Sequence, residues 1–349
     1  MSSTVVNRLN PLARREPSAS LNEEVAPERG FLIEHIGTVS IAIVLVLLLV
    51  GFGLASPVFF SQANWLATSQ YGVEYLILGI GETFVIVGGG IDLSVGAVLG
   101  FSSMTAAVVM TSISATGGDA GLTIPIGALV SVAVGAGCGL LNGLLVTKVK
   151  LGAFITTLGT LGIWTGGIDL LHGGTEIANL PSALGGIGST AYGGWFTIPV
   201  IVMAVLAVVL GVVLAKTRFG MNTYAIGSSE VAARRGGINV ESHMVAVYTL
   251  AGLLAGVAGF LVMARFSDAS PLAGANDELD AIAATVIGGA SLLGGRGSVA
   301  GTTIGTAIVS ILVTGLVLIN LSSFWQEVAV GVVLIGAITI DRVSRLART

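Results

Sequence analysis

The stretch "FTIPVIVMAVLAVVLGVVLAKTRFG", residues 196–220, decides the fold. Its first twenty residues, 196–215, carry no charge, and Lys216 and Arg218 follow at once. About 20 apolar residues are what an α-helix needs to cross the hydrocarbon core of a bilayer. Basic residues beside such a helix are typical of the cytosolic boundary. The stretch therefore predicts a helix that crosses a membrane and ends in the cytosol.

The composition of the whole chain agrees with this prediction. Of the 349 residues, 54% are hydrophobic and 10% are charged, and the mean hydropathy is +0.95. Soluble domains carry about 25% charged residues, so too few charges remain here to cover a water-facing surface. The 51 glycines are about twice the usual share of ~7%, and small residues let helices pack closely in lipid. We predict an all-α, polytopic membrane protein.

Further apolar runs mark the other candidate spans. We predict about ten membrane helices, of which the eighth is short, at 36–56, 65–87, 93–113, 122–147, 153–171, 196–215, 240–264, 279–293, 298–319 and 324–341. An even number of spans places both termini on one side. The chain then divides into an N-terminal tail (1–35), a membrane domain (36–342) and a C-terminal tail (343–349).

The distribution of Lys and Arg orients these spans, because loops on the cytosolic side carry an excess of both. With the N-terminus inside, Arg265 is the single basic residue of the 15 that lies outside. The others fall on the inside: Arg8, Arg14, Arg15, Arg29, Lys148, Lys150, Lys216, Arg218, Arg234, Arg235, Arg296, Arg342, Arg345 and Arg348. We therefore expect both tails, and the long loop 216–241, to be cytosolic.

No motif for bond-breaking chemistry occurs in the sequence. The chain lacks a P-loop, a G-x-S-x-G, an H-E-x-x-H and a C-x-x-C motif. Cys138 is the single cysteine, and the three histidines lack the spacing of metal ligands. We expect no enzymatic activity, no metal and no cofactor in this chain. With a net charge of −4, we expect no nucleic-acid partner.

Two glycine-rich segments resemble one another. The first, "VIVGGGIDLSVG" (85–96), contains Gly88, Gly89, Gly90, Asp92 and Ser94; the second, "VIGGASLLGGRGSVAG" (286–301), contains Gly294, Gly295 and Arg296. Glycine allows a tight turn between two helices, and Asp at a helix start accepts backbone N–H bonds. We interpret both as structural or gating turns. The likeness indicates an internal repeat of the kind transporters contain, or only the similarity of any two glycine-rich membrane turns.

Acidic residues within the predicted spans leave an alternative open. Glu74, Glu82, Asp92 and Asp169 lie in or beside apolar runs, and buried acids in membrane helices are costly and often functional. Glu82 and Asp92 could couple transport to an ion. Helix ends near water, or hydrogen bonds to neighbouring helices, explain the same residues without a transport role.

The stretch "GSSEVAARRGGI", 227–238, is polar between apolar runs and predicts a short capped helix at 229–236. Ser228 or Ser229 can cap its start, and Glu230 suits the first turn. The last turn carries Arg234 and Arg235, and Gly236 and Gly237 end the helix. Ala232 and Ala233 form a small face between them. The segment is either a docking site for a cytosolic partner or an ordinary solvated loop.

Five stretches together resemble the permease subunits of bacterial ATP-binding-cassette sugar importers of the ribose type. They are "TFVIVGGGIDLSVGAVLG" (83–100), "NGLLVTKVKLGAFITTLGTLGIWTGG" (142–167), "YAIGSSEVAARRGGINV" (224–240), "ATVIGGASLLGGRGSVAGTTIG" (284–305) and "FWQEVAVGVVLIGAITIDR" (324–342). They cover most of the chain in the order of that family. Two positions depart from its usual pattern, Ala153 before Phe154 and Thr165 in the fifth span, and both bear on the substrate rather than the fold.

The resemblance implies a protein of the bacterial inner membrane that forms a translocation path with a second permease chain. It also implies a cytosolic ATPase, which binds ATP and Mg²⁺, and an extracytoplasmic sugar-binding protein. In this family the loop corresponding to 216–241 couples the permease to the ATPase, and we call it the coupling loop. The matching positions and their neighbours here are Ala225, Gly227, Ser229, Glu230, Ala232, Ala233, Arg234, Arg235, Gly237 and Ile238.

The substrate path is less sharply marked than the coupling loop. We take Phe84, Asn142, Phe154, Thr157 and Trp164 as candidates. Aromatic rings could stack on a sugar, but core packing explains them equally well. The expected function is the translocation subunit of an importer for a monosaccharide or related polyol. The alternatives are an ion-coupled secondary transporter of a small polar solute and a passive channel or structural membrane protein.

Overall fold

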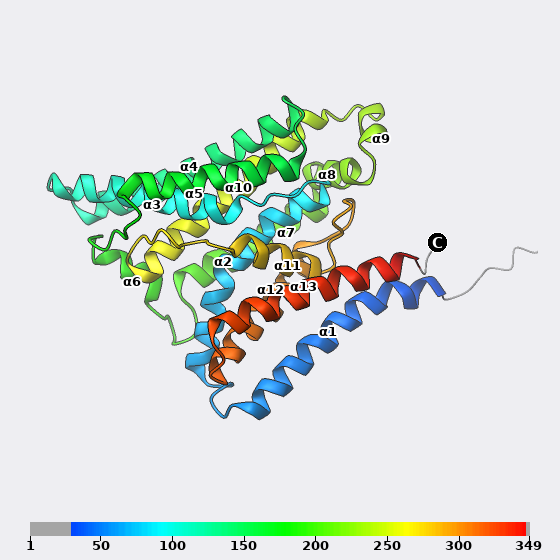
Figure 1. The fold of residues 1–349 in the computed structure, drawn as a ribbon, viewed down its shortest axis with the longest axis horizontal. Helices are drawn as coiled ribbons and strands as arrows, with labels where there is room; N and C mark the ends of the chain where they lie inside the picture. The colour runs from blue at the N-terminus through cyan, green and yellow to red at the C-terminus, as the bar shows by residue number, and fades with distance from the viewer. Residues whose placement is uncertain (1–28, 347–349) are drawn as a thin grey trace, which may run out of the picture.

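The computed structural model describes residues 29–346, and this part of the chain is helical throughout, apart from its connections (Figure 1). Its only strand-like pairs are the single bridges Ile177–Ala269 and Tyr192–Phe196. The all-α prediction is confirmed for these residues. Most of the predicted N-terminal tail (1–28) and the last residues of the C-terminal tail (347–349) lie outside the described residues.

Each predicted span coincides with a helix. These helices are α1 (Arg29–Ala55), α2 (Gln62–Val87), α3 (Val95–Ala115), α4 (Ala120–Thr147), α5 (Ala153–His172), α7 (Ile198–Lys216), α10 (Val240–Phe266), α11 (Asp277–Ile287), α12 (Val299–Leu318) and α13 (Ser323–Leu346). Six of them, α3, α4, α5, α7, α10 and α12, are long and apolar enough to cross a membrane. The chain is therefore a multi-pass membrane protein, and the full count of ten crossings stays a prediction.

Three further helices are short, and two of them, α6 (Ala183–Ser189) and α8 (Arg218–Ser228), were not predicted from the sequence. α6 lies in the long loop after α5, and α9 (Glu230–Arg235) is the predicted capped helix. α8 directly precedes α9, so the coupling loop holds two helices rather than one. Thr217 caps α8 by accepting a hydrogen bond from the N–H of Gly220 at 3.4 Å.

The predicted eighth span, 279–293, is wrong at its C-terminal end. α11 stops at Ile287, and Gly288 and Gly289 follow, the latter with φ of +94°. Only glycine adopts that region readily, so the pair ends the helix. A Cβ at Gly288 would collide with the backbone of Gly301 at the start of α12. The apolar residues after Ile287 therefore belong to a turn that leads into α12.

The long helix α10 is central to the bundle and packs against α4, α2 and α3. Glycines make the contact with α4 close: a Cβ on Gly252 would lie 2.7 Å from the Cα of Gly139. The hydroxyl of Ser131 on α4 also donates a 2.7 Å hydrogen bond to the carbonyl of Gly256 on α10. This backbone contact explains part of the high glycine content, since small residues permit tight packing in lipid.

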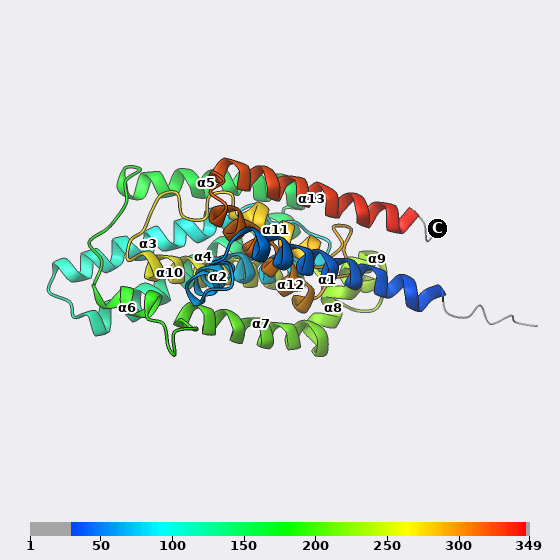
Figure 2. The same cartoon turned by 90° about the horizontal axis from the view of Figure 1, so that it is seen from below.

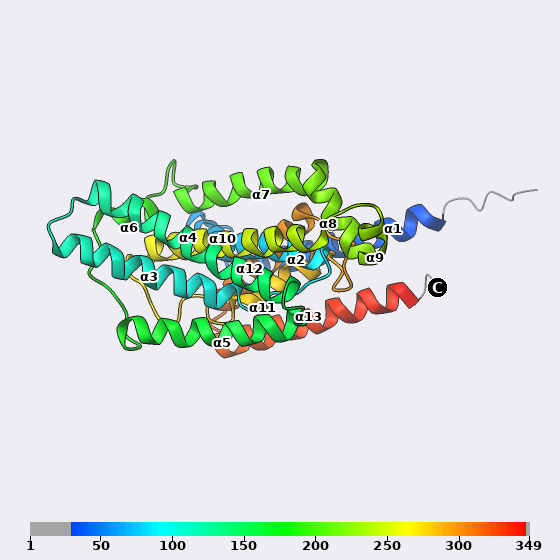
Figure 3. The same cartoon turned by 90° about the horizontal axis from the view of Figure 1, so that it is seen from above.

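The remaining helices surround this centre. α7 lies along one edge of the bundle, and α5 and α13 lie along the opposite edge (Figures 2 and 3). The start of α1 and the end of α13 lie at the same end of the molecule as α9 (Figure 1). This arrangement agrees with the even number of spans expected from the sequence.

Candidate coupling and gating site

Three glycine segments that are distant in sequence meet at one point. The N–H of Gly295 donates a 2.9 Å hydrogen bond to the carbonyl of Val87, the last residue of α2. Gly227, near the end of α8, fits against this bond: an added Cβ would strike the Val87 carbonyl and lie 2.6 Å from the Gly295 nitrogen. A Cβ on Gly294 would lie 3.0 Å from the Cα of Gly89. We call Gly89, Gly227, Gly294 and Gly295 the glycine node.

Backbone geometry adds a second reason for glycine at the node. Gly89, Gly294 and Gly295 have φ values of +86°, +84° and +72°, a region that side chains disfavour. Tyr224 on α8 reinforces the contact by donating a 2.7 Å hydrogen bond to the carbonyl of Gly297. Sequence reasoning named these glycines in three separate motifs, and the structure brings them together.

The short helix α9 is capped and fixed by charges. The hydroxyl of Ser229, rather than Ser228, accepts a hydrogen bond from the N–H of Ala232 at 3.3 Å. Arg234 pairs with Glu230 at 2.7 Å and with Glu241 on α10 at 2.6 Å. The hydrogen bonds that the Arg234 guanidinium donates to these two carboxylates raise its pKa above the usual value. The second ion pair ties α9 to the start of α10.

The two alanines of α9 face opposite ways, which corrects the expectation that both form one outward surface. Ala233 is only 5% exposed and packs into the main hydrophobic core of the bundle. Ala232 is exposed, as is Arg235, and Val231 is 61% exposed. Residues 231, 232 and 235 therefore lie on the exposed side of α9, and Ala233 holds the helix to the bundle.

α8 anchors the coupling loop to the bundle through Phe219 and Thr223. The Phe219 ring lies 4.6 Å from the ring of His243 on α10 and 5.9 Å from that of Phe84 on α2. The Thr223 hydroxyl and the His243 Nε2 lie 2.8 Å apart. Thr223 and Ile226 are buried and Phe219 is partly buried, and the three follow a helical spacing of four and three. That spacing is the sequence signal from which α8 could have been predicted.

A buried polar cluster follows the first glycine turn. The Asp92 carboxylate accepts hydrogen bonds from the N–H of Ser94 at 2.9 Å and from its hydroxyl at 2.7 Å. The amide of Asn142 on α4 donates to the Ser94 hydroxyl at 2.7 Å and lies 3.3 Å from the second Asp92 oxygen. Ser94, not Asp92, occupies the N-cap position of α3. Asp92 thus orders the turn before the helix and links it to α4.

The four acidic candidates have different surroundings. Glu74 lies 3.9 Å from Arg265, and Asp169 is exposed. The surroundings of both residues can be explained without a role in transport. Glu82 is fully buried; its carboxylate interacts with the backbone N–H of Asp92, and no side chain of a described residue forms a hydrogen bond with it. A purely structural role therefore explains Glu82 less well than it explains the other three acidic residues.

The five path candidates do not converge on one site. Phe84 is fully buried against Phe219, and Asn142 belongs to the Asp92 cluster. On α5, the Thr157 hydroxyl donates to the Ala153 carbonyl at 3.0 Å. The Trp164 ring lies 5.3 Å from that of Phe101. Phe154 alone among the three aromatic candidates presents an exposed ring, with 54% of its surface accessible.

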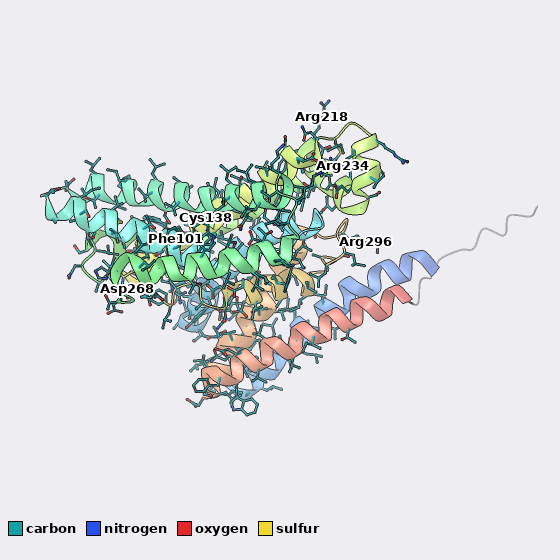
Figure 4. All side chains as sticks on the ribbon, turned by 45° about the horizontal axis from the view of Figure 1, so that its top comes forward. Phe101, Cys138, Arg218, Arg234, Asp268 and Arg296 are labelled. Atoms are coloured by element: carbon teal, nitrogen blue, oxygen red, sulfur yellow. The ribbon has the colours of Figure 1, made fainter. Side chains whose placement is uncertain are left out.

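The charged residues divide between the two ends of the bundle. Arg218, Arg234 and Arg296 lie at the end that contains α9, and Asp268 lies at the other (Figure 4). Arg296 follows the second glycine pair, and its carbonyl accepts a 3.0 Å hydrogen bond from the N–H of Ser291. The separation of charges agrees with the orientation expected from the distribution of Lys and Arg.

Comparison with known proteins identifies the family. The family described as "Branched-chain amino acid transport system / permease component" matches residues 63–338. The ribose import permease protein RbsC of Bacillus subtilis (strain 168) is 41% identical, over 85% of this chain and 90% of that protein. The fructose import permease protein FrcC of Rhizobium meliloti is 35% identical, over 86% of this chain and 84% of that protein.

A third relative, the D-allose transport system permease protein AlsC of Escherichia coli (strain K12), is also 35% identical, over 86% of this chain and 90% of that protein. No solved structure matches the chain. The resemblance drawn from the sequence motifs is confirmed. The chain belongs to this family of transport-system permease components, and it is a multi-pass permease of the inner membrane rather than an enzyme.

Proposed function

We propose that this chain forms the translocation path of an ATP-binding-cassette importer for a monosaccharide or related polyol. The relatives that match most of its length are named for the import of ribose, fructose and allose. One observation carries the proposal. Gly227, in the helix α8 that directly precedes α9, packs against both Val87 at the end of α2 and Gly295 in the turn before α12. Such a linkage can pass a displacement at the surface into the bundle.

The proposal assigns each end of the molecule to one side of the membrane. The α9 end, with Arg218, Arg234 and Arg296, is cytosolic, as are both tails and the coupling loop 216–241. Ten helices cross the membrane. A cytosolic ATPase, which binds ATP and Mg²⁺, docks on the surface formed by Val231, Ala232 and Arg235. A second copy of this chain, or a close paralogue, completes the path, and an extracytoplasmic binding protein delivers the sugar.

α9 suits the role of a docking element because it is rigid although short. An isolated helix of six residues is unstable in water. Here Ser229 caps it, Arg234 ties it to α10, and Ala233 packs in the core. A partner that displaces α9 must therefore also displace α8 and the glycine node. The same contacts argue against an ordinary solvated loop.

One observation favours a second candidate, an ion-coupled secondary transporter. Glu82 is fully buried without a side-chain hydrogen-bond partner among the described residues, and Asp92 lies beside it. Buried acids in membrane helices often carry protons or bind cations. In this alternative the two carboxyl groups bind the coupling ion, and transport needs no ATPase.

Reconstitution distinguishes the two candidates. The chain is placed in liposomes with its ATPase and binding protein, and uptake of labelled ribose, fructose and allose is measured with and without ATP on the ATPase side. We expect uptake only when all three proteins and ATP are present, and no uptake by the permease alone under a proton or sodium gradient. Gradient-driven uptake without the ATPase would establish the alternative.

A further inference from the structure

A cavity of about 520 Å³ lies between α9 and the first glycine turn, residues 88–90. Its walls come from the ends of α2 and α4, the start of α10, and α9. We call it the vestibule and define it by Gly88, Thr147, Lys150, Arg234, Glu241 and Tyr248. Its volume falls in the range of about 300–1,000 Å³ that small-molecule sites occupy. None of the five path candidates lines it.

The charges around the vestibule are balanced. Two cations, Lys150 and Arg234, face two carboxylates, Glu230 and Glu241. Arg234 already engages both carboxylates, at 2.7 and 2.6 Å, so no unpaired guanidinium is left to attract an anion. A neutral molecule with several hydroxyl groups suits this rim, since carboxylates accept hydrogen bonds and ammonium and guanidinium groups donate them.

Tyr248 supplies a polar group on the inner wall of the vestibule. Its side chain is fully buried; the backbone N–H of Ile91 interacts with its hydroxyl oxygen, and the O–H itself donates to no acceptor among the described residues. The hydroxyl lies against Gly90, where a Cβ would collide with it. A buried O–H that donates to no acceptor costs free energy, and an oxygen of a ligand in the vestibule would supply that acceptor.

We propose that the vestibule is a second sugar site, open to the cytosol, at which the imported monosaccharide binds after its release. This inference rests on the proposed function. A sugar there would touch α10 through Glu241 and Tyr248, α4 through Thr147 and α9 through Arg234. The bound sugar would hold α9 in its present position relative to the first glycine turn. Because a ligand stabilises the conformation that it binds best, internal sugar slows ATP-driven uptake.

The test uses the complete importer in liposomes that are preloaded with unlabelled D-ribose. The initial rate of labelled ribose uptake and the rate of ATP hydrolysis are both measured as functions of the internal concentration. In the natural protein, both rates fall as internal ribose rises. The experiment is repeated with fructose and allose, because these are the sugars named for the relatives.

Two substitutions locate the effect in the vestibule. Tyr248→Phe removes one oxygen and keeps the ring, so the internal concentration needed for half-inhibition rises about three- to tenfold, the effect of one neutral hydrogen bond. Thr147→Trp fills the cavity and removes the inhibition. Val149→Trp, at an exposed neighbour that does not line the cavity, is the matched control and keeps the natural sensitivity. Each inhibition is expressed relative to the variant's own rate without internal sugar.

The outcomes separate this inference from the proposed function. Absence of ATP-driven uptake in the natural protein defeats the proposed function and the inference with it. Normal uptake that internal sugar does not slow overturns the inference alone. Inhibition that Tyr248→Phe and Thr147→Trp both leave unchanged also overturns it, because the sugar would then act elsewhere. If Thr147→Trp does not fold, the result with Tyr248→Phe decides.

Discussion

The N–H of Gly295 donates a 2.9 Å hydrogen bond to the carbonyl oxygen of Val87. This bond joins the end of α2 to the turn before α12 and makes the two glycine-rich segments one unit. Gly227 of α8 packs on that bond so closely that no Cβ would fit. A displacement of the coupling loop must therefore reach both glycine turns at once, as a coupling mechanism requires.

The first prediction tests the glycine node by adding one methyl group. Gly227→Ala places a Cβ against the Val87 carbonyl and the Gly295 nitrogen. Overpacking of a fitted contact costs about 1–3 kcal/mol, more than the gain of up to ~1 kcal/mol from replacing glycine in a helix. We expect a lower melting temperature of the purified permease in detergent and a loss of uptake.

Gly137→Ala is the control for this prediction. Gly137 also lies in a helix, α4, but an added Cβ there would meet no described atom within 4 Å. Its melting temperature should equal or exceed that of the natural protein. If Gly227→Ala melts like Gly137→Ala and transports normally, the node does not restrain the coupling loop.

The second prediction concerns the turn at Asp92. Asn retains an oxygen that can accept the 2.9 Å hydrogen bond from the N–H of Ser94, so Asp92→Asn should be mild. Asp92→Leu leaves the N–H and hydroxyl of Ser94, and part of the Asn142 amide, without their present acceptor. Each unsatisfied buried group costs about 1–3 kcal/mol. We expect Asp92→Leu to lower the yield of folded protein and to abolish uptake.

Uptake assays at fixed expression level check this ranking. Asp169→Asn and Asp169→Leu form a matched pair at an exposed position and should both behave like the natural protein. An Asp92→Asn variant as inactive as Asp92→Leu would show that the negative charge itself is needed. The ion-coupled alternative, with Glu82 as the second group, would then become the better explanation.

The sequence predicted the helices well because hydropathy alone specifies them. Each of the ten apolar runs contains a helix, although the eighth ends at Ile287, and the cap of α9 at Ser229 follows from side-chain chemistry next to the backbone it serves. α8 was missed because a half-apolar helix at the membrane surface lacks a long apolar run. Its core-facing positions, 219, 223 and 226, of which the first is partly buried, are recognisable only when the helical period is sought.

The glycine node and the orientation of α9 could not be predicted in the same way. Val87, Gly227 and Gly295 meet only through the packing of α2, α8 and the turn before α12, and nothing local in their sequence indicates a common site. Ala232 and Ala233 are chemically identical neighbours. Which of them is buried depends on how α9 lies on α10, and the Arg234–Glu241 ion pair contributes to that placement.

The third prediction tests the orientation of the bundle. The native Cys138 is only 4% exposed, so it should give little background with a water-soluble thiol reagent. In cells that express the permease without its ATPase, Ser229→Cys should react only after the membrane is made permeable. Leu272→Cys, in the loop after α10 and 79% exposed, should react in intact cells. The reversed labelling pattern would invert the proposed topology.

The last prediction separates docking from folding on α9. Ala232 is exposed between Val231 and Arg235, whereas Ala233 is buried in the core. A tryptophan at 232 extends into the space where a partner would sit, so Ala232→Trp should leave the permease folded but reduce co-purification of the ATPase. A tryptophan at 233 must displace the core beneath it. Ala233→Trp should therefore lower the melting temperature of the permease even without a partner.

Two measurements on the same two variants decide the matter. The melting temperature of the isolated permease reports folding, and recovery of a co-expressed ATPase reports docking. Overpacking costs about 1–3 kcal/mol, and 1.4 kcal/mol is a tenfold change in affinity, so either effect should be measurable. Ala232→Trp with normal ATPase recovery and normal ATP-driven uptake would show that the outer face of α9 is not the docking surface. A stable Ala233→Trp permease would show instead that the contact beneath α9 is loose, and that α9 could then move without carrying the glycine node with it.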